Sequence, residues 1–243
     1  MSPNPTRFIE HLRQLGYHPR SDKHSNVLAE CIVTDLIQHC KIIRDKAANG
    51  ELVYDLNFDL IVGRSTWNVD LVIGAPQLGA QIVAETGIVR SRPASVEIAI
   101  ELKTVMTEHR KAVKNRKRDL EAHHEHVHNY YAHAIAGGVF VINAAETFKS
   151  PLRGKEVVTV HKNPLKLVEH CISELRSVSA RGGPTGYGLE AQCAIVVAVS
   201  NMEVPAEYIV TPPAPQVGDP LHYDSFIRRM CDAYQQRFAP HHG

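Results

Sequence analysis

The clearest pattern in the chain is a stretch, residues 94–103, in which apolar and polar residues alternate. Its apolar set is Val96, Ile98, Ile100 and Leu102, and its second set is Glu97, Ala99, Glu101 and Lys103. A period of two predicts a β-strand that presents the two sets to opposite faces. Glu101 and Lys103 are therefore expected on one face, near the end of a rigid element. Glu97 would share that face but lie about 13 Å away, in solvent.

Apolar periodicity predicts the other elements. Helices are expected over 6–16, 25–48, 107–136, from Asn163-Pro164 onward and over 223–238, and strands over 51–65, 67–74, 139–143 and 191–200. Thr107 would be the N-cap of the third helix, and Gly137-Gly138 would end it. Helices interspersed with strands predict an α/β fold, in which a mixed central sheet is flanked by helices. One domain is expected over 1–243, with its core at about 25–200 and the terminal helices as elaborations.

Three segments read as irregular. Residues 75–93, around Ile82-Val83-Ala84, suggest a hairpin or insertion without an assigned role. The glycine-rich segment 180–188 has no Gly-Lys-Ser/Thr ending and no preceding strand, so it is not a P-loop, and a disordered connector is favoured over a mobile closing loop. Residues 205–220 are rich in proline.

Composition excludes some classes of protein. Hydrophobic content is 44% and charged content 22%, as in folded domains. The longest apolar runs are too short to cross a membrane, and no signal peptide is evident. The five cysteines are scattered, odd in number and free of Cys-x-x-Cys, which predicts reduced, buried thiols and a cytoplasmic protein.

The net charge is only +1, but one segment is strongly basic. Residues 103–118 hold seven Lys and Arg and one acid, Glu108. Such a patch attracts phosphate, although it also suits a solvated helix face. Arg110, Lys114 and Arg116, at the edges of the helix stripe formed by Val113, Leu120 and Val127, are the candidates for DNA binding.

Candidate chemistry centres on Glu101 and Lys103. A carboxylate and an ammonium on one face of a strand suit metal-assisted phosphodiester hydrolysis: the carboxylate holds a divalent cation, and the lysine orients or deprotonates water. Asp70 lies 31 positions earlier on another β-type run, so adjacent antiparallel strands could bring Asp70 and Glu101 together. Asp59 is the rival for this first acid.

These residues resemble the motif of the PD-(D/E)XK nuclease superfamily, the restriction-endonuclease-like fold. Asp70 matches its first acid, Glu101 its second and Lys103 its lysine, while Val69 stands where the family usually has proline. The resemblance covers roughly residues 25–143. The order of a long helix, strands with the acid, the Glu-x-Lys strand, a basic helix and an apolar strand is similar to that of the family's core.

The resemblance implies a Mg²⁺-dependent DNA endonuclease in which Mn²⁺ could substitute. Asp70, Glu101 and the backbone carbonyl of Leu102 would bind the metal, Lys103 would position the water, and Glu30 could support the site. A type II restriction enzyme is favoured, and double-strand cleavage implies a homodimer. A resolvase, a repair nuclease, a phage-defence effector or a binding module with an inactive core remain alternatives.

A histidine-rich run offers a rival site. His124 and His128 lie one helical turn apart, and Glu121 precedes His124 by three residues. This spacing could hold a transition metal, but it lacks the His-Glu-x-x-His order that places a general base between ligands. Exposed or hydrogen-bonded histidines are favoured over a zinc or iron centre.

Overall fold

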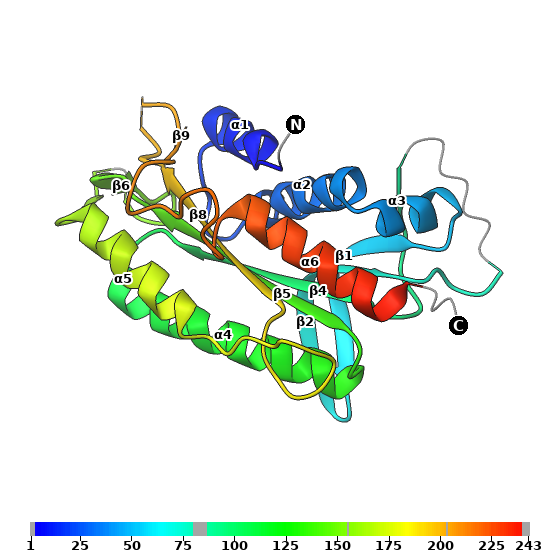
Figure 1. Cartoon of the computed structure of the whole chain (residues 1–243). Helices are drawn as coiled ribbons and strands as arrows, with labels where there is room; N and C mark the ends of the chain where they lie inside the picture. The colour runs from blue at the N-terminus through cyan, green and yellow to red at the C-terminus, as the bar shows by residue number, and fades with distance from the viewer. Residues whose placement is uncertain (1–2, 80–86, 155, 203, 240–243) are drawn as a thin grey trace.

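The computed structural model describes residues 3–79, 87–154, 156–202 and 204–239 (Figure 1). The helices are α1 (Thr6–Leu15), α2 (Lys23–His39), α3 (Lys41–Ala48), α4 (His109–Tyr130), α5 (Pro164–Arg176) and α6 (Tyr223–Phe238). The strands are β1 (Val53–Val62), β2 (Ser65–Gly74), β3 (Val89–Arg90), β4 (Ile98–Val105), β5 (Ile135–Asn143), β6 (Thr147–Lys149), β7 (Val158–Val160), β8 (Ala191–Ala198) and β9 (Glu207–Tyr208).

A seven-stranded sheet in the order β3-β1-β2-β4-β5-β8-β9 forms the centre of the fold. β1, β2 and β4 are antiparallel in turn, whereas β4, β5 and β8 run parallel, so the sheet is mixed. Strands β6 and β7 pair separately. The predicted α/β class with a mixed central sheet flanked by helices is confirmed.

The helices cover the two faces of the sheet with separate cores. α1, α2, α3 and α6 lie on one face, and α4 and α5 on the other (Figure 1). Val113, Leu120 and Val127 of α4 are fully buried, as the predicted apolar stripe requires. None of the described helices is long and apolar enough to cross a membrane.

The helix predicted over 25–48 is interrupted at Cys40. This residue is extended (φ −112°, ψ 102°) between α2 and α3, and it forms a disulfide with Cys231 of α6. The prediction of reduced thiols is therefore wrong for this pair. Cys31, Cys171 and Cys193 are free and buried, as expected of small core residues.

The predicted limits of α4 are also wrong. Glu108, in a left-handed conformation, precedes the helix, and Thr107 does not cap it. Gly137 and Gly138 do not end the helix but lie inside β5. A Cβ on Gly138 would come within 2.8 Å of Leu189 and 3.0 Å of Leu120, so the missing side chain lets α4 approach the sheet closely.

Strand β4 begins at Ile98, later than predicted, and Glu97 just before it is not solvated. The Glu97 carboxylate accepts a hydrogen bond from the Tyr234 hydroxyl and lies 3.6 Å from the Lys46 ammonium. Both partners belong to helices on the face opposite α4. The alternation does not extend to Glu97, because this residue precedes the strand.

The segment 75–93 returns to the edge of the sheet. Val89–Arg90 pairs in parallel with β1, and Pro76 bridges to Pro93. The Ile82-Val83-Ala84 part of the predicted hairpin or insertion lies outside the described residues.

Candidate active site

The candidate site lies where β2 and β4 separate. Their ladder covers only Leu71 to Ile73 on β2 and Ile98 to Ile100 on β4. Before Leu71, β2 continues as a hairpin with β1, while β4 beyond Ile100 pairs with β5 alone. The edge of β4 from Glu101 onward is therefore open towards β2, and Asp70 stands at the mouth of this fork.

Three predicted residues meet at the fork. The Asp70 carboxylate accepts the backbone N–H of Leu102 at 2.7 Å, and the Lys103 ammonium lies 3.9 Å from the same carboxylate oxygen. Lys103 also forms a close ion pair with Glu101, whose side chain is only 2% exposed. We call this group the Asp70–Glu101–Lys103 cluster. The rival Asp59 is exposed on β1, where it accepts a hydrogen bond from Asn68 outside the cluster.

The cluster has one cation for two carboxylates, and the pKa values of both carboxyl groups are raised. Burial, reinforced by the Asp70 charge, raises the pKa of Glu101 to about 8 even though Lys103 opposes the shift. Burial likewise raises the pKa of Asp70. For Lys103, burial alone would lower the pKa, but Glu101 and Asp70 outweigh it, and its pKa is raised. The ammonium therefore stays charged at neutral pH.

A divalent cation fits this arrangement. Glu101 Oε2 is buried and has no hydrogen-bond partner among the described residues, so one carboxylate oxygen is left unsatisfied. In a β-strand the N–H and C=O of one residue point to the same side. The Leu102 carbonyl therefore faces the open edge beside Asp70. Asp70, Glu101 and this carbonyl form a set of hard oxygen donors, the type that Mg²⁺ binds.

The donor set is small. Among the described residues, no group of three or more His, Cys, Asp or Glu side chains is arranged to hold a metal ion. Two carboxylates and a carbonyl are compatible with Mg²⁺, which keeps several waters and is usually bound by one or two carboxylates.

His123 of α4 extends the site. Its Nε2 lies 3.3 Å from the Ala99 carbonyl, which can only accept, so the proton is assigned to Nε2. Nδ1 is then an acceptor, and it lies 3.7 Å from Glu101 Oε2. Burial lowers the pKa of His123 to about 3, so the ring is neutral. A neutral imidazole beside Glu101 does not offset the carboxylate charge.

Asp119, one turn before His123 on α4, also acts on the cluster and is paired with Arg116. Arg116 and Asp119 form an ion pair at 3.0 Å, and the charge of Asp119 raises the pKa of both Glu101 and Lys103. Arg116 was predicted as a DNA contact, whereas Asp119 was missed. Its spacing of four residues from His123, on the helix edge that faces the fork, was the available signal.

The other predicted residues lie elsewhere. Glu30 pairs with Arg7 at 2.8 Å and has no contact with the cluster among the described residues. Arg110 and Lys114 line a groove of about 390 Å³ between α4 and α5, together with Lys162, Asn163, Lys166, Leu167 and His170. No described lining residue is acidic, and no Lys or Arg of the groove has an ion-pair partner in the described chain. We call this the α4–α5 groove.

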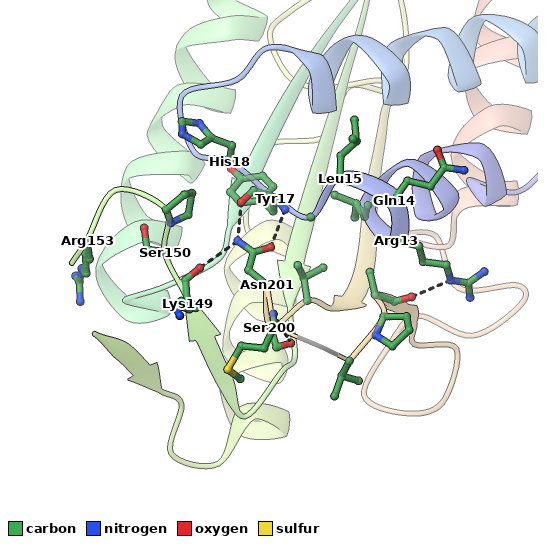
Figure 2. A pocket seen from close by; sticks show the side chains of 18 residues that line it. Arg13, Gln14, Leu15, Tyr17, His18, Lys149, Ser150, Arg153, Ser200 and Asn201 are labelled. Atoms are coloured by element: carbon green, nitrogen blue, oxygen red, sulfur yellow. Dashed lines mark hydrogen bonds between the residues drawn. The ribbon is translucent and has the colours of Figure 1, made fainter. Parts of the chain in front are cut away.

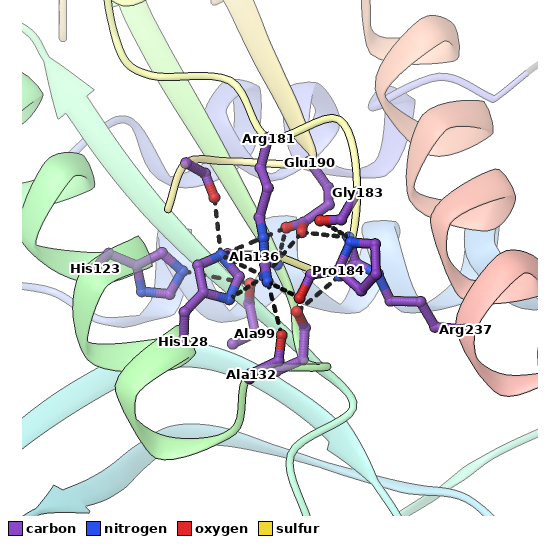
Figure 3. Close-up of polar contacts among 12 residues, drawn as sticks. Ala99, His123, His128, Ala132, Ala136, Arg181, Gly183, Pro184, Glu190 and Arg237 are labelled. Atoms are coloured by element: carbon purple, nitrogen blue, oxygen red, sulfur yellow. Dashed lines mark hydrogen bonds and ion pairs between the residues drawn. The ribbon is translucent and has the colours of Figure 1, made fainter. Parts of the chain in front are cut away.

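The histidine run serves a buried ionic network (Figure 3). Arg181 lies 2.6 Å from His128 Nδ1 and donates to the Ala132 carbonyl at 2.8 Å. Glu190 pairs with Arg237 at 2.7 Å and with Arg181 at 3.3 Å. Of the three residues considered for a metal site, Glu121, His124 and His128, the last is thus bound to a guanidinium.

The same network holds the glycine-rich segment 180–188. Arg181 donates to the carbonyls of Thr185 and Pro184, and Arg237 donates to that of Gly183. The prediction of a disordered connector is wrong, because buried arginines bind the backbone of this loop.

No protein-family model matches this chain, and no match is found among curated proteins or among solved structures. The assignment of the Asp70–Glu101–Lys103 cluster therefore depends on the geometry of the described residues and on the motif in the sequence.

Proposed function

We propose that this chain is a metal-dependent DNA endonuclease with the Asp70–Glu101–Lys103 cluster as its active site. The observation that carries the proposal is the meeting of two carboxylates and an ammonium at the fork of β2 and β4. The mixed α/β sheet is compatible with the restriction-endonuclease-like core that the sequence resembles. A cluster of this kind suits phosphodiester hydrolysis better than it suits stability, because buried charges are costly to desolvate.

In this proposal Asp70, Glu101 and the Leu102 carbonyl hold Mg²⁺, which Mn²⁺ can replace. The bound ion supplies a Lewis acid that offsets negative charge on the phosphate and acidifies bound water. Lys103, kept charged by both carboxylates, orients the attacking water and neutralises part of the phosphate charge. In the same proposal Arg116, paired with Asp119, contacts the DNA backbone.

The substrate is proposed to be duplex DNA. The α4–α5 groove supplies four cations that have no counter-ion among the described residues, and Lys and Arg side chains of this kind bind phosphates irrespective of sequence. Within the class we favour a type II restriction enzyme, because the sequence carries no helicase or ATPase motif. Cleavage of both strands needs two clusters, and hence a homodimer.

The test is incubation of supercoiled plasmid and phage DNA with the chain in Mg²⁺, followed by sequencing of the ends. Cleavage is expected in Mg²⁺ or Mn²⁺ and not in EDTA. Glu101→Ala and Lys103→Ala should abolish it, whereas the matched control Asp59→Asn, an exposed acid on the neighbouring strand, should cut like the wild type. Full cutting by Glu101→Ala would refute the assignment.

The inactive-core alternative makes a different prediction. A pure binding module would hold DNA with an affinity that falls with salt, and it would not nick plasmid in any divalent cation. Binding without nicking by the wild type would therefore favour that alternative.

A further inference from the structure

A second hollow lies at the carboxyl ends of the parallel strands (Figure 2). It has a volume of about 580 Å³, within the usual range for small-ligand sites. Its walls come from three distant parts of the chain: the end of α1 with Tyr17 and His18, residues 149–151 with Arg153, and residues 199–202 and 204–206 after β8. In open α/β sheets, ligands bind outside the carboxyl ends of the strands. We call this hollow the Tyr17 pocket.

The Tyr17 pocket is preformed. The side-chain amide of Asn201 accepts the Tyr17 N–H at 2.7 Å and donates to the carbonyls of Tyr17 at 2.7 Å and Lys149 at 3.1 Å. Figure 2 shows these bonds joining all three walls. A Cβ on Gly16 would come within 2.9 Å of Asn201 Oδ1, so glycine leaves room for this amide. A ligand would meet walls that are already in place.

The lining combines cations with exposed apolar side chains. The cations Arg13, Lys149 and Arg153 line the pocket, of which Arg13 also pairs with Glu10 at 3.1 Å and Arg153 lies 3.7 Å from Glu108. None of the described lining residues is acidic. The Lys149 ammonium has no polar partner among the described residues. Leu15, Met202 and Val204 are 64%, 43% and 65% exposed, which is unusual for large apolar residues gathered at one hollow. This lining suits a molecule with an apolar ring and an anionic group.

The pocket is connected to the candidate active site. The Tyr17 hydroxyl hydrogen-bonds Thr104 Oγ1 at 2.6 Å, and Thr104 directly follows Lys103 on β4. The charge of Arg116, which flanks the cluster, also acts on Tyr17. The pocket therefore adjoins β4 at the residue next to Lys103.

We propose that the Tyr17 pocket binds one nucleotide unit of the DNA strand that occupies the cluster. The base lies against Leu15, Met202 and Val204, and its phosphate contacts Lys149 and Arg153. Such a unit must leave the base stack, which costs least at an unpaired or strand-terminal position. That the nucleotide belongs to a DNA strand rests on the proposed function. Binding of a nucleoside phosphate in the pocket does not depend on cleavage.

The first experiment is calorimetric titration of the whole chain in EDTA with dAMP, dGMP, dCMP and dTMP. Deoxyadenosine and inorganic phosphate are titrated alongside. At least one nucleotide is expected to bind at one site per chain, about tenfold or more tighter than the nucleoside or phosphate alone. The double variant Lys149→Ala/Arg153→Ala should weaken it about tenfold or more, because each cation makes a charge-assisted contact.

Two controls locate the site. Lys41→Ala/Arg228→Ala removes two exposed cations from α3 and α6 that do not line the pocket, and should bind nucleotide like the wild type. Lys103→Ala should also retain the nucleotide. Loss of binding in Lys103→Ala alone would place the nucleotide in the cluster and overturn the proposal, as would a failure of every nucleotide to saturate. Thermal unfolding confirms that each variant is folded.

The second experiment tests the source of the nucleotide. Oligonucleotide duplexes with 2-aminopurine at successive positions are bound in EDTA, and fluorescence is expected to rise at one position because the base leaves the stack. The rise should be lost in Lys149→Ala/Arg153→Ala. Binding of free nucleotide without any such rise would show that the pocket takes a free small molecule, which overturns the strand assignment. If the protein binds nucleotide in the Tyr17 pocket but does not cleave DNA, only the proposed function is refuted.

Discussion

Asp70 takes the place of a strand partner for Leu102: its carboxylate accepts the Leu102 N–H at 2.7 Å just where β4 loses its ladder with β2. The carboxylate thus has a structural role as well as a negative charge. Removing it altogether would leave a backbone donor unpaired. Asp70→Asn keeps an oxygen acceptor and removes only the charge, so it is the better variant for testing function.

Metal binding should raise the thermal stability of the folded protein. A cation that binds the folded chain and not the unfolded chain raises the unfolding temperature with concentration. The Tm of the wild type is expected to be higher in millimolar Mg²⁺ than in EDTA. Asp70→Asn and Glu101→Gln should lose this shift, while Asp59→Asn should keep it. An equal shift in all four proteins would mean that Mg²⁺ binds elsewhere.

The high pKa of Glu101 gives a pH dependence of defined sign. In the metal-free folded chain its pKa is about 8, against 4.5 for an ordinary glutamate. Between these values the folded chain keeps a proton that the unfolded chain has released, so the contribution of Glu101 to the free energy of unfolding falls as pH rises. Glu101→Gln removes this contribution and should gain stability relative to the wild type between pH 5 and pH 8.

Urea unfolding in EDTA at pH 5, 6.5 and 8 measures that difference. The comparison between the two proteins cancels groups that they share, including His123, whose lowered pKa gives the opposite slope below pH 6.5. The prediction would be contradicted if the free energies of unfolding of the wild type and Glu101→Gln differed by the same amount at all three pH values.

The α4–α5 groove should determine part of the salt dependence of DNA binding. Each phosphate contact contributes about 0.9 to the slope of log K against log salt concentration. Lys162→Ala/Lys166→Ala is expected to lower this slope by about 1.8, uniformly across sequences. Binding is measured in EDTA, by fluorescence anisotropy. Lys41→Ala/Arg228→Ala serves as the matched control, and an equal loss in both variants would indicate only an effect of total charge.

The Arg181 network should be important for stability. Arg181→Ala leaves Glu190 buried with one cation fewer and frees the carbonyls of the 180–188 loop. Breaking a buried pair in this way costs about 3–5 kcal/mol in the free energy of unfolding. Arg176→Ala, which removes a more exposed ion pair with Asp219, should cost about 1 kcal/mol or less. Comparable losses from the two substitutions, measured by denaturant unfolding, would contradict this difference.

The sequence predicted most of the candidate site because its residues lie on strands with a strict period. Alternation placed Glu101 and Lys103 on one face, and the structure confirms their contact. The alternation gave a wrong prediction for Glu97, which precedes the strand. The sequence pattern also predicted a helix end at Gly137, which lies inside a strand. Asp119 was missed because its proximity to Glu101 depends on how α4 crosses the sheet, a tertiary relationship that no local pattern encodes.

Cys40 shows the same limit. Its apolar neighbours continue a helical stripe, so the break between α2 and α3 has no local signal. The break coincides with the contact to Cys231 of α6, 191 residues away in the chain. Packing against a distant helix overrides local propensity at such a point.

The position of α6 has a consequence for folding during synthesis. Helix α6 lies over the sheet (Figure 1), its side chains Phe226, Ile227 and Met230 are buried, and Tyr223 donates to Asp35 of α2. A ribosome-bound chain that has emerged only as far as α5 carries every residue of the cluster, yet it still lacks α6 and strand β8 of the sheet. The apolar side chains that pack beneath α6 are then exposed. A nascent chain should therefore stay sensitive to protease until α6 docks.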